Sequence, residues 1–370
     1  MKVIIVGSAY PYRSKVSTFN HNLARQLVAD GNEVEIVTYK NYGLRDNNSS
    51  DSSSTGNIKV TQMISSKNPM SWRRTANYIK KLLPDEVIFA YTNSRASVCM
   101  GNIAQKLDDN NKIKRIAIIK DIIPDDANVL DRILPYKFAR NVDGFVCVNM
   151  GIYEDIEHFE KVPKPKKYSR LPINVPYGTR IPRAMALEQL SLDPSFRYLL
   201  FFGYIRPYKG LDLLIEALAD ERLRKYNVKL LVAGEFKDDI QPYIDKIQST
   251  GTGEFLEMRT EYISNRDVNK YFSAADMVVQ TYKKPKDSGV TQMAYHFEKP
   301  MLVTNVKKLA DIVPNGVVGY VVNTTPKDIA DAIVDFYENN RQEEFEKNVA
   351  VEKEKFSWSN FTKTIETLFD

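Results

Sequence analysis

Residues 201–218 read FFGYIRPYKGLDLLIEAL and mark the passage from a buried strand to a helix. Residues 197–202 are mostly apolar and have the length of a buried strand, whereas the apolar residues that follow recur on one helical face: Leu211, Leu214, Ile215 and Leu218. Between them lie Gly203, which permits close approach of the backbone, and the cations Arg206 and Lys209. Cations beside the unpaired N–H groups of a helix N-terminus are typical of a phosphate site.

A second loop-to-helix junction occurs later in the same half of the chain, at residues 286–290 (KDSGV). Ser288 is a natural N-cap there, because its hydroxyl can accept from the first N–H groups of a helix. Basic residues in a single turn are often only solvated. Two helix N-termini that converge, with Arg206 and Lys209 beside one of them, instead favour a clamp for a diphosphate.

The opening of the chain predicts an α/β fold. Residues 2–6 form a buried strand, residues 8–17 a loop, and Phe19, Leu23, Ala24 and Leu27 one face of a helix. Residues 33–39 form the second strand, so a strand, helix and strand unit with a parallel sheet is expected. The later strands are predicted at residues 86–91, 115–119, 144–148, 197–202, 228–233, 255–259, 277–280 and 301–303.

Two domains and a terminal helix are predicted. The chain of 370 residues is long enough for two cores, and residues 161–182 are irregular and rich in proline and lysine, as an interdomain passage would be. We therefore expect a first domain over residues 1–175 and a second over 176–355. Residues 356–370 form a last amphipathic helix with the apolar stripe Trp358, Phe361, Ile365 and Leu368.

Composition excludes several classes of protein. A net charge of +5, from 52 basic and 47 acidic residues, is too dilute to indicate a nucleic-acid partner, although it suits an anionic substrate. Cys99 and Cys147 form no disulfide framework, and Cys147 lies in an apolar run typical of core packing. The three histidines lack metal-ligand spacing and there is no Asp-X-Asp triplet. No metal is therefore expected.

The sequence predicts a cytoplasmic protein. The apolar run at the start ends after Gly7, too early for the core of a signal peptide, and no apolar run approaches the ~20 residues that span a membrane. Further along, Trp72, Ala76, Ile79 and Leu83 fall on one helical face. The basic flank of that helix consists of Arg73, Arg74, Lys80 and Lys81. It is either a solvated face or a peripheral contact with the anionic inner face of the cell membrane.

Residues 201–217, 275–282, 288–300 and 311–322 together resemble the C-terminal half of a GT-B glycosyltransferase of the large retaining group called family 4. The resemblance is specific in the second half of the chain and diffuse in the first. It implies two Rossmann-like, doubly wound parallel-sheet domains that face each other across a cleft, with the last helix packed on the first domain. It also implies a nucleotide-sugar donor, UDP-sugar or GDP-sugar, and no further cofactor.

The resemblance assigns roles to residues of the second half. Arg206 and Lys209 stabilise the leaving diphosphate and can replace a metal ion. The residues expected to contact the nucleotide sugar are Gly203, Tyr204, Asp287, Ser288, Gly289, Val290 and Gln292. Tyr204 stands where the family usually has arginine, and Arg206 can supply that guanidinium. Pro285 and Met293 stand where the family has a pair of glutamates that bind donor sugar and ribose.

The first half offers fewer candidates. In the family, the loop after the first strand carries a Gly-Gly pair, whereas this chain has Ser14-Lys15 and the nearby cation Arg13. Lys120-Asp121 follows a predicted strand directly, at the carboxyl end where open parallel sheets bind ligands. Relatives often have His or Asn at this place. Asp121 is the candidate catalytic or acceptor-orienting carboxylate, the alternative being a structural role.

The sequence thus predicts a metal-independent, retaining glycosyltransferase that moves a sugar from a nucleoside-diphosphate sugar to a saccharide or lipid-linked acceptor. Synthesis of a surface polysaccharide or glycoconjugate is the expected setting. Two alternatives stay open. A nucleotide-sugar epimerase of the same architecture would need more acid and base residues than a chain with three histidines offers. A non-catalytic binding relative would explain why both glutamates are absent.

Overall fold

The structure is a computed structural model, and it describes residues 1–12, 14–40, 58–91, 96–108, 112–120, 129–148, 150–173, 177–284, 288–306 and 309–370. The chain divides into two compact units. Unit 1 comprises Met1–Pro172 with Lys355–Asp370, and unit 2 comprises Ile173–Glu354. The sequence placed the corresponding boundaries after residues 175 and 355. Among the described residues, no helix combines the length and the apolar character needed to cross a bilayer.

Unit 1 is built on a parallel sheet of seven strands within the described residues. In spatial order the strands are β3 (Lys59–Ile64), β2 (Glu33–Tyr39), β1 (Lys2–Val6), β4 (Glu86–Tyr91), β5 (Lys114–Ile119), β6 (Gly144–Cys147) and β7 (Lys166–Tyr168). The inner strand β1 is buried on both faces, as an apolar run in a parallel sheet should be. β7 is the last strand of the sheet, so one of its edges has no neighbouring strand.

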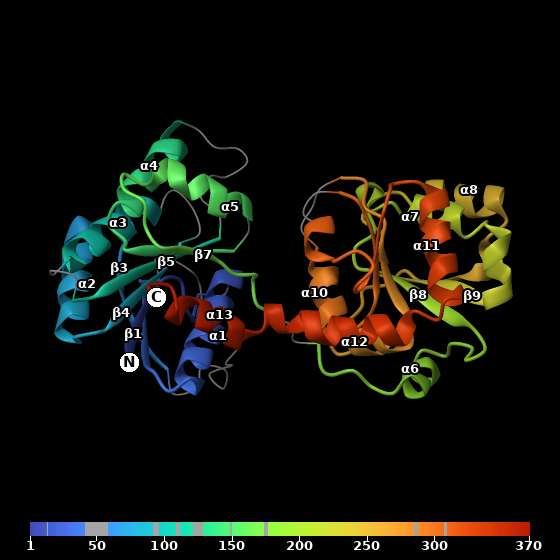
Figure 1. The fold of residues 1–370 in the computed structure, drawn as a ribbon, viewed down its shortest axis with the longest axis horizontal. Coiled ribbons are helices and arrows are strands. Elements are labelled where there is room, and N and C mark those ends of the chain that lie inside the picture. The colour runs from blue at the N-terminus through green and yellow to red at the C-terminus, as the bar shows by residue number, and fades with distance from the viewer. Residues whose placement is uncertain are drawn as a thin grey trace. The chain divides into compact units, whose positions relative to one another are not determined.

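Helices cover both faces of this sheet (Figure 1). α1 (Lys15–Ala29) and α13 (Trp358–Glu366) pack on one face, where Phe19, Leu23, Phe361 and Ile365 join the core. α2 (Pro69–Lys81), α3 (Ala96–Leu107) and α4 (Val129–Ala139) pack on the other, and α5 (Met150–Asp155) follows β6. Cys147 lies in this second core, where burial raises the pKa of its thiol to about 12.

Unit 2 contains a second parallel sheet, of six strands within the described residues. Its order is β10 (Leu256–Arg259), β9 (Val228–Ala233), β8 (Arg197–Phe202), β11 (Met277–Gln280), β12 (Met301–Thr304) and β13 (Gly319–Val322). α7 (Leu211–Ala217), α8 (Gln241–Thr250) and α11 (Pro326–Glu338) pack on one face. The remaining helices are α6 (Arg183–Gln189), α9 (Val268–Ala274), α10 (Gly289–His296) and α12 (Gln342–Lys353).

Three local predictions were wrong. Leu83 is not the fourth member of the apolar face of α2, because the helix ends at Lys81 and Leu83 adopts a φ of 50° with 82% of its surface exposed. α1 begins at Lys15, inside the predicted loop, because the Ser14 hydroxyl caps the Ser17 N–H at 3.1 Å. Part of the predicted passage at residues 161–182 is strand β7, which pairs with β6 in unit 1.

Candidate active site

The junction between β8 and α7 is a turn that depends on two glycines. Gly203 follows β8 with a φ of +89°, and Gly210 precedes α7 with a φ of +71°. A Cβ atom on Gly210 would lie 2.0 Å from the Thr281 carbonyl oxygen, so only glycine fits there. The Thr281 hydroxyl donates to the carbonyl of Gly210 at 2.8 Å and lies 3.2 Å from that of Lys209. The end of β11 therefore fixes the turn that carries Lys209.

Lys209 points inward at this turn, and only 7% of its surface is exposed. Its Nζ donates to the Phe202 carbonyl at 3.3 Å and lies 6.0 Å from the centre of the Tyr282 ring. Burial, and secondly the positive charge of Arg206, lower the pKa of Lys209 to about 8. An ammonium has three donors, and the described residues offer this one a single hydrogen-bond acceptor. Two N–H groups thus remain for an anion.

Gly203 and Val290 complete the surroundings of this ammonium. A Cβ atom built on Gly203 would lie 3.2 Å from the Lys209 Nζ and 3.8 Å from the Val290 Cγ2. Val290 belongs to the first turn of α10. The structure therefore brings together three residues that the sequence singled out from two separate junctions, and it places the ammonium near the N-terminus of a helix.

The N-terminus of α10 is held by a network of hydrogen bonds. Ser288 accepts from the Val290 N–H at 3.2 Å and donates to Gln280 Oε1 at 2.5 Å, and its oxygen lies 3.1 Å from the Tyr282 hydroxyl. Gln280 Oε1 also accepts from the Thr291 hydroxyl at 3.1 Å. Because its hydroxyl is engaged on every side, Ser288 positions the helix rather than presenting a free donor.

The sequence interpretation missed Gln280, Thr281 and Tyr282. Burial raises the pKa of Tyr282 to about 12, so its hydroxyl remains a neutral hydrogen-bonding group. The Nε2 of Gln280 is buried and has no partner within the described residues. A signal existed, since the polar residues QT directly follow the apolar residues MVV of β11, at the end of a parallel strand.

Arg206 does not join Lys209 in a shared hydrogen-bonded site. Its guanidinium Nη1 lies 3.8 Å from Asp238 Oδ2, with about half of each side chain exposed. Arg206 and Asp238 line a cavity of about 430 Å³, whose other walls are Pro207, Tyr208, Lys283 and Lys284. Lys283 is itself paired with Asp212 at 2.6 Å. Arg206 thus acts on Lys209 through its charge and contributes its side chain to a neighbouring cavity.

The other predicted nucleotide ligands lie around this centre. Tyr204 is half exposed, and the Lys237 ammonium stands 4.4 Å from the centre of its ring. Gly289 is exposed at the start of α10, and Gln292 is half-buried on that helix. Asp287, with Pro285, lies outside the described residues. Met293, at the other glutamate position, is half-buried.

In unit 1 the structure describes Lys120 rather than the predicted candidate Asp121. Asp121 and Arg13 lie outside the described residues, but Lys120 directly follows β5. Its Nζ stands 3.2 Å from the centre of the Phe19 ring, and burial lowers the pKa of Lys120 to about 7. The described parts of the chain contain no group of three or more His, Cys, Asp or Glu residues that could hold a metal ion.

Comparison with known proteins supports a glycosyltransferase. Residues 185–353 match the family Glycosyl transferases group 1. A D-inositol 3-phosphate glycosyltransferase from Segniliparus rotundus is 41% identical over 73 residues, which cover 19% of this chain and 16% of that protein. An uncharacterized glycosyltransferase from Methanocaldococcus jannaschii is 21% identical, over 100% of this chain and 98% of that protein.

Solved structures identify the fold. HepE from Anabaena, in a crystal structure with UDP, aligns with a TM-score of 0.67 at 13% identity and covers 99% of this chain and 98% of its own. Sucrose-phosphate synthase from Thermosynechococcus elongatus aligns with a TM-score of 0.63 at 14% identity, over 100% of this chain and 98% of that one. The two Rossmann-like parallel-sheet units are therefore those of the GT-B fold, and the predicted fold class is confirmed.

Proposed function

We propose that this protein is a metal-independent, retaining glycosyltransferase of family 4 type. It transfers a sugar from UDP-sugar or GDP-sugar to a saccharide or lipid-linked acceptor, in the synthesis of a surface polysaccharide or glycoconjugate. The observation that carries the proposal is the Lys209 ammonium, buried beside Gly203 with two N–H groups unused. The match of residues 185–353 to the group 1 glycosyltransferases supports glycosyl transfer as the reaction class.

The proposed chemistry follows from where charge develops. As the glycosidic bond to the nucleotide breaks, the departing diphosphate gains negative charge. A fixed cation aimed at that charge lowers the barrier, typically by ~3 kcal/mol for one donor. Lys209 is suited to this role because its turn is fixed in advance by Gly210 and Thr281. Its unused N–H groups would bind the diphosphate, and the N–H groups at the start of α10 would add a favourable dipole.

Titration calorimetry in EDTA tests this proposal. We expect UDP or GDP to bind the wild-type protein without a divalent metal, and Lys209→Met to weaken that binding by about tenfold, as the loss of one charged hydrogen bond would. Lys347→Met is the matched control, because Lys347 is an exposed lysine of α12 in the same unit, paired with Glu343. Binding that requires Mg²⁺ or Mn²⁺, or equal binding by the two variants, would contradict the metal-free clamp.

A non-catalytic nucleotide-binding relative is the second candidate. It is favoured by Met293, which stands half-buried on α10 where the resemblance expects one of the two glutamates that bind donor sugar and ribose. Donor turnover separates the two functions. A glycosyltransferase consumes its nucleotide sugar and releases the nucleoside diphosphate, at least slowly to water, whereas a binding relative only retains it. Release of the nucleoside diphosphate from a panel of UDP-sugars and GDP-sugars is the measurement.

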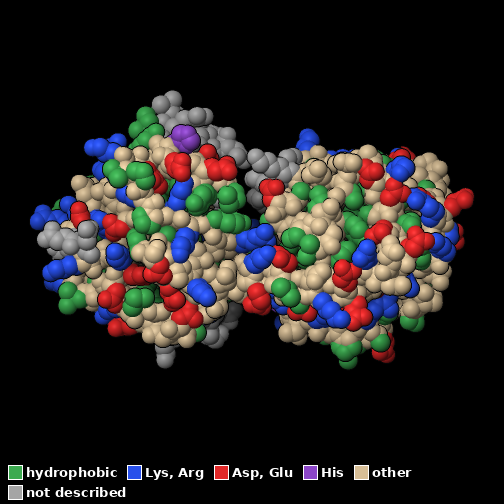
Figure 2. Space-filling model, in the orientation of Figure 1, with side chains coloured by type: hydrophobic (Ala, Val, Ile, Leu, Met, Phe, Trp, Pro, Cys, Tyr) green, Lys and Arg blue, Asp and Glu red, His purple; other side chains and the backbone are tan. Residues whose placement is uncertain are grey.

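Contact with an anionic membrane is a further part of the proposal. On α2, Arg73, Arg74 and Lys81 are exposed, and the exposed apolar side chains Met70 and Leu83 flank them. Figure 2 shows Lys and Arg side chains gathered along this edge of unit 1. Such a surface suits the head groups of acidic lipids, and each cation near the bilayer adds about 1 kcal/mol.

Vesicle sedimentation tests the membrane contact. The wild type should sediment with phosphatidylserine-containing vesicles at low salt, and the double variant Arg73→Glu and Lys81→Glu should stay in the supernatant. Vesicles of phosphatidylcholine alone are the control, because they offer the same apolar interior without net charge. Equal partitioning to both kinds of vesicle would remove this part of the proposal.

A further inference from the structure

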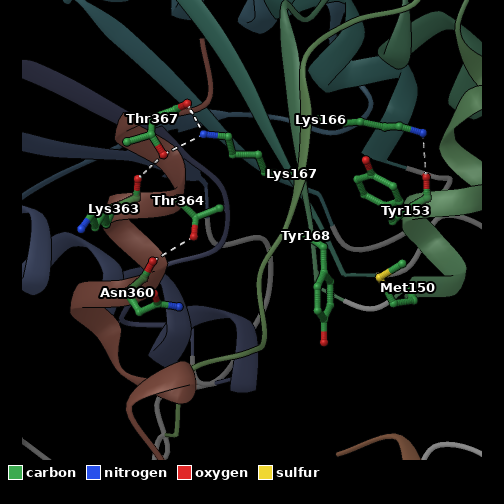
Figure 3. Close-up of a pocket in the computed structure, with 9 residues that line it drawn as sticks. All are labelled: Met150, Tyr153, Lys166, Lys167, Tyr168, Asn360, Lys363, Thr364 and Thr367. Carbon is green, nitrogen blue, oxygen red and sulfur yellow. Dashed lines mark hydrogen bonds between the residues drawn. The ribbon is translucent and has the colours of Figure 1, made fainter. Parts of the chain in front are cut away.

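Unit 1 has a cavity of about 540 Å³ at the β7 edge of its sheet. None of the residues that line it was discussed for the active site. Figure 3 shows its two walls: α13 contributes Asn360, Lys363 and Thr364, with Thr367 just beyond it, and α5 contributes Met150 and Tyr153. The edge strand β7 lies between these walls and contributes Lys166, Lys167 and Tyr168. Three lysines and no acidic residue therefore line this cavity, which we call the edge cavity.

Two of the lysines are held in place by the fold. The Lys166 Nζ donates to the Tyr153 carbonyl at 3.2 Å, stands 4.3 Å from the centre of that tyrosine ring and pairs with Glu157. The Lys167 Nζ donates to the carbonyl and the hydroxyl of Thr367 at the end of α13. Each ammonium has two hydrogen-bond acceptors for its three donors, so one N–H of each is free for a ligand. Lys363 is exposed on α13, and no ion pair engages it within the described residues.

The uncharged lining has the character of a saccharide site. Tyr168 projects between the two helices with 37% of its surface exposed, and it offers an aromatic face with a hydroxyl group. Asn360 is exposed on α13, across the cavity from Tyr168, and its carboxamide donates to the Lys355 carbonyl at 3.4 Å. The Thr364 hydroxyl donates to the backbone carbonyl of Asn360 at 2.9 Å. Aromatic faces cover the C–H surface of a sugar ring, and amides and hydroxyls pair with its hydroxyl groups.

We infer that the edge cavity binds an acidic saccharide, one whose sugars carry carboxylate groups, and that it holds the acceptor chain. The cations select for charge, and Tyr168 and Asn360 select for sugar. This inference rests on the proposed function, since it names the class of acceptor that a glycosyltransferase would extend. An added peptide strand is the rival occupant of any free sheet edge. It fits poorly, because β7 has only three residues and two of them are lysines.

Calorimetry of the full chain at low salt, with hexagalacturonate as the probe, tests the inference. We expect binding that weakens as salt is added, and much weaker binding of neutral maltohexaose. Tyr168→Ala should reduce the affinity for hexagalacturonate about tenfold, through the lost aromatic contact. Lys363→Ala should reduce it by about threefold, as expected for an exposed ion pair. Both side chains lie at the surface, so neither change should alter thermal unfolding.

The matched controls are Tyr262→Ala, an exposed tyrosine of unit 2, and Lys106→Ala, an exposed lysine on α3. Neither should change the affinity. Equal binding of maltohexaose would overturn the role of charge, and equal binding of polyglutamate would overturn the selection for sugar. Absence of hexagalacturonate binding would overturn the inference altogether. UDP and GDP titrations of the same variants separate the two proposals, because nucleotide binding at Lys209 should survive Tyr168→Ala and Lys363→Ala.

Discussion

Each unit of this protein has a lysine beyond the carboxyl end of a strand whose ammonium is largely shielded from water, yet the two surroundings differ. In unit 2, Lys209 lies in a turn fixed by Gly210 and Thr281, and its ammonium donates to the Phe202 carbonyl. In unit 1, the Lys120 ammonium rests against the face of Phe19, and within the described residues it has no hydrogen-bond acceptor. Burial lowers the pKa of Lys209 to about 8 and that of Lys120 to about 7.

The two lysines differ in how their positive charge is compensated and in whether space is left for an anion. A buried ammonium is costly unless groups of opposite charge or hydrogen-bond acceptors compensate it. At Lys209 the compensation is partial, while Gly203 leaves space beside the two unused N–H groups, so the chain has kept room for an anion. At Lys120 the aromatic ring compensates less, because a cation above a ring gains only ~1–2 kcal/mol. Lys209 should therefore matter chiefly for function, and Lys120 should also be a cost to stability.

The largest expected effect is that of Lys209→Ala on turnover. If the ammonium stabilises the leaving diphosphate, its interaction strengthens in the transition state, so turnover should fall by roughly 10²-fold or more while donor binding falls less. Initial rates with the active donor give the turnover, and calorimetric titration gives the affinity for the donor. Lys347→Ala, which removes an exposed lysine of α12, should keep its activity. A folded Lys209→Ala protein with full activity would contradict the proposed site. Lys209 would then have no functional role that distinguishes it from Lys120.

A smaller effect is expected when the space beside Lys209 is filled. In Gly203→Ala the new methyl group would lie 3.2 Å from the Lys209 Nζ, at a φ of +89° that disfavours any side chain. We expect a loss of about 1 kcal/mol or more in the free energy of unfolding by urea, together with weaker nucleotide binding. Gly316→Ala is the matched control, because its φ is +71° and nothing lies within 4 Å of an added Cβ atom, so it should lose stability without losing nucleotide affinity. Unchanged stability and nucleotide affinity in Gly203→Ala would mean that the turn adapts to the added methyl group.

Much of the fold was predictable because apolar runs and helical spacing are local signals. The pattern of Leu211, Leu214 and Ile215 predicted α7, and all three are buried. Edge strands lack such a signal. β7 reads KKY, and it exists because β6 supplies a partner rather than because its residues favour a strand. The prediction for Leu83 was wrong for a related reason. The helical spacing of apolar residues in the sequence continues to Leu83, although the helix ends at Lys81.

The candidate site was predictable only at the two junctions where a glycine and a basic residue precede a helix. Gly203, Lys209 and Val290 were chosen from two junctions, and the structure brings them together. The network of Gln280, Thr281 and Tyr282 was missed, because polar residues after a strand do not reveal which of them point inward. Arg206 was predicted to act together with Lys209 because the two are close in sequence. Sequence proximity does not reveal that its guanidinium turns toward Asp238.

The smallest expected effect concerns Lys120→Met, which replaces a buried ammonium by an uncharged side chain of similar length. The pKa of Lys120 is about 7 in the folded protein and near 10.5 in the unfolded chain, so between these values the unfolded state binds more protons. The wild type therefore gains stability from this group as pH rises from 7 to 10.5, and the cost of burying the charge is fully present below pH 7. Lys120→Met should raise the midpoint of thermal unfolding at pH 6, and the gain should shrink toward zero by pH 10. Lys106→Met, at an exposed position, should show no such pH dependence. If Lys120→Met is instead less stable at every pH, the contact with Phe19 outweighs the burial of the charge, and Lys120 is as well accommodated in unit 1 as Lys209 is in unit 2.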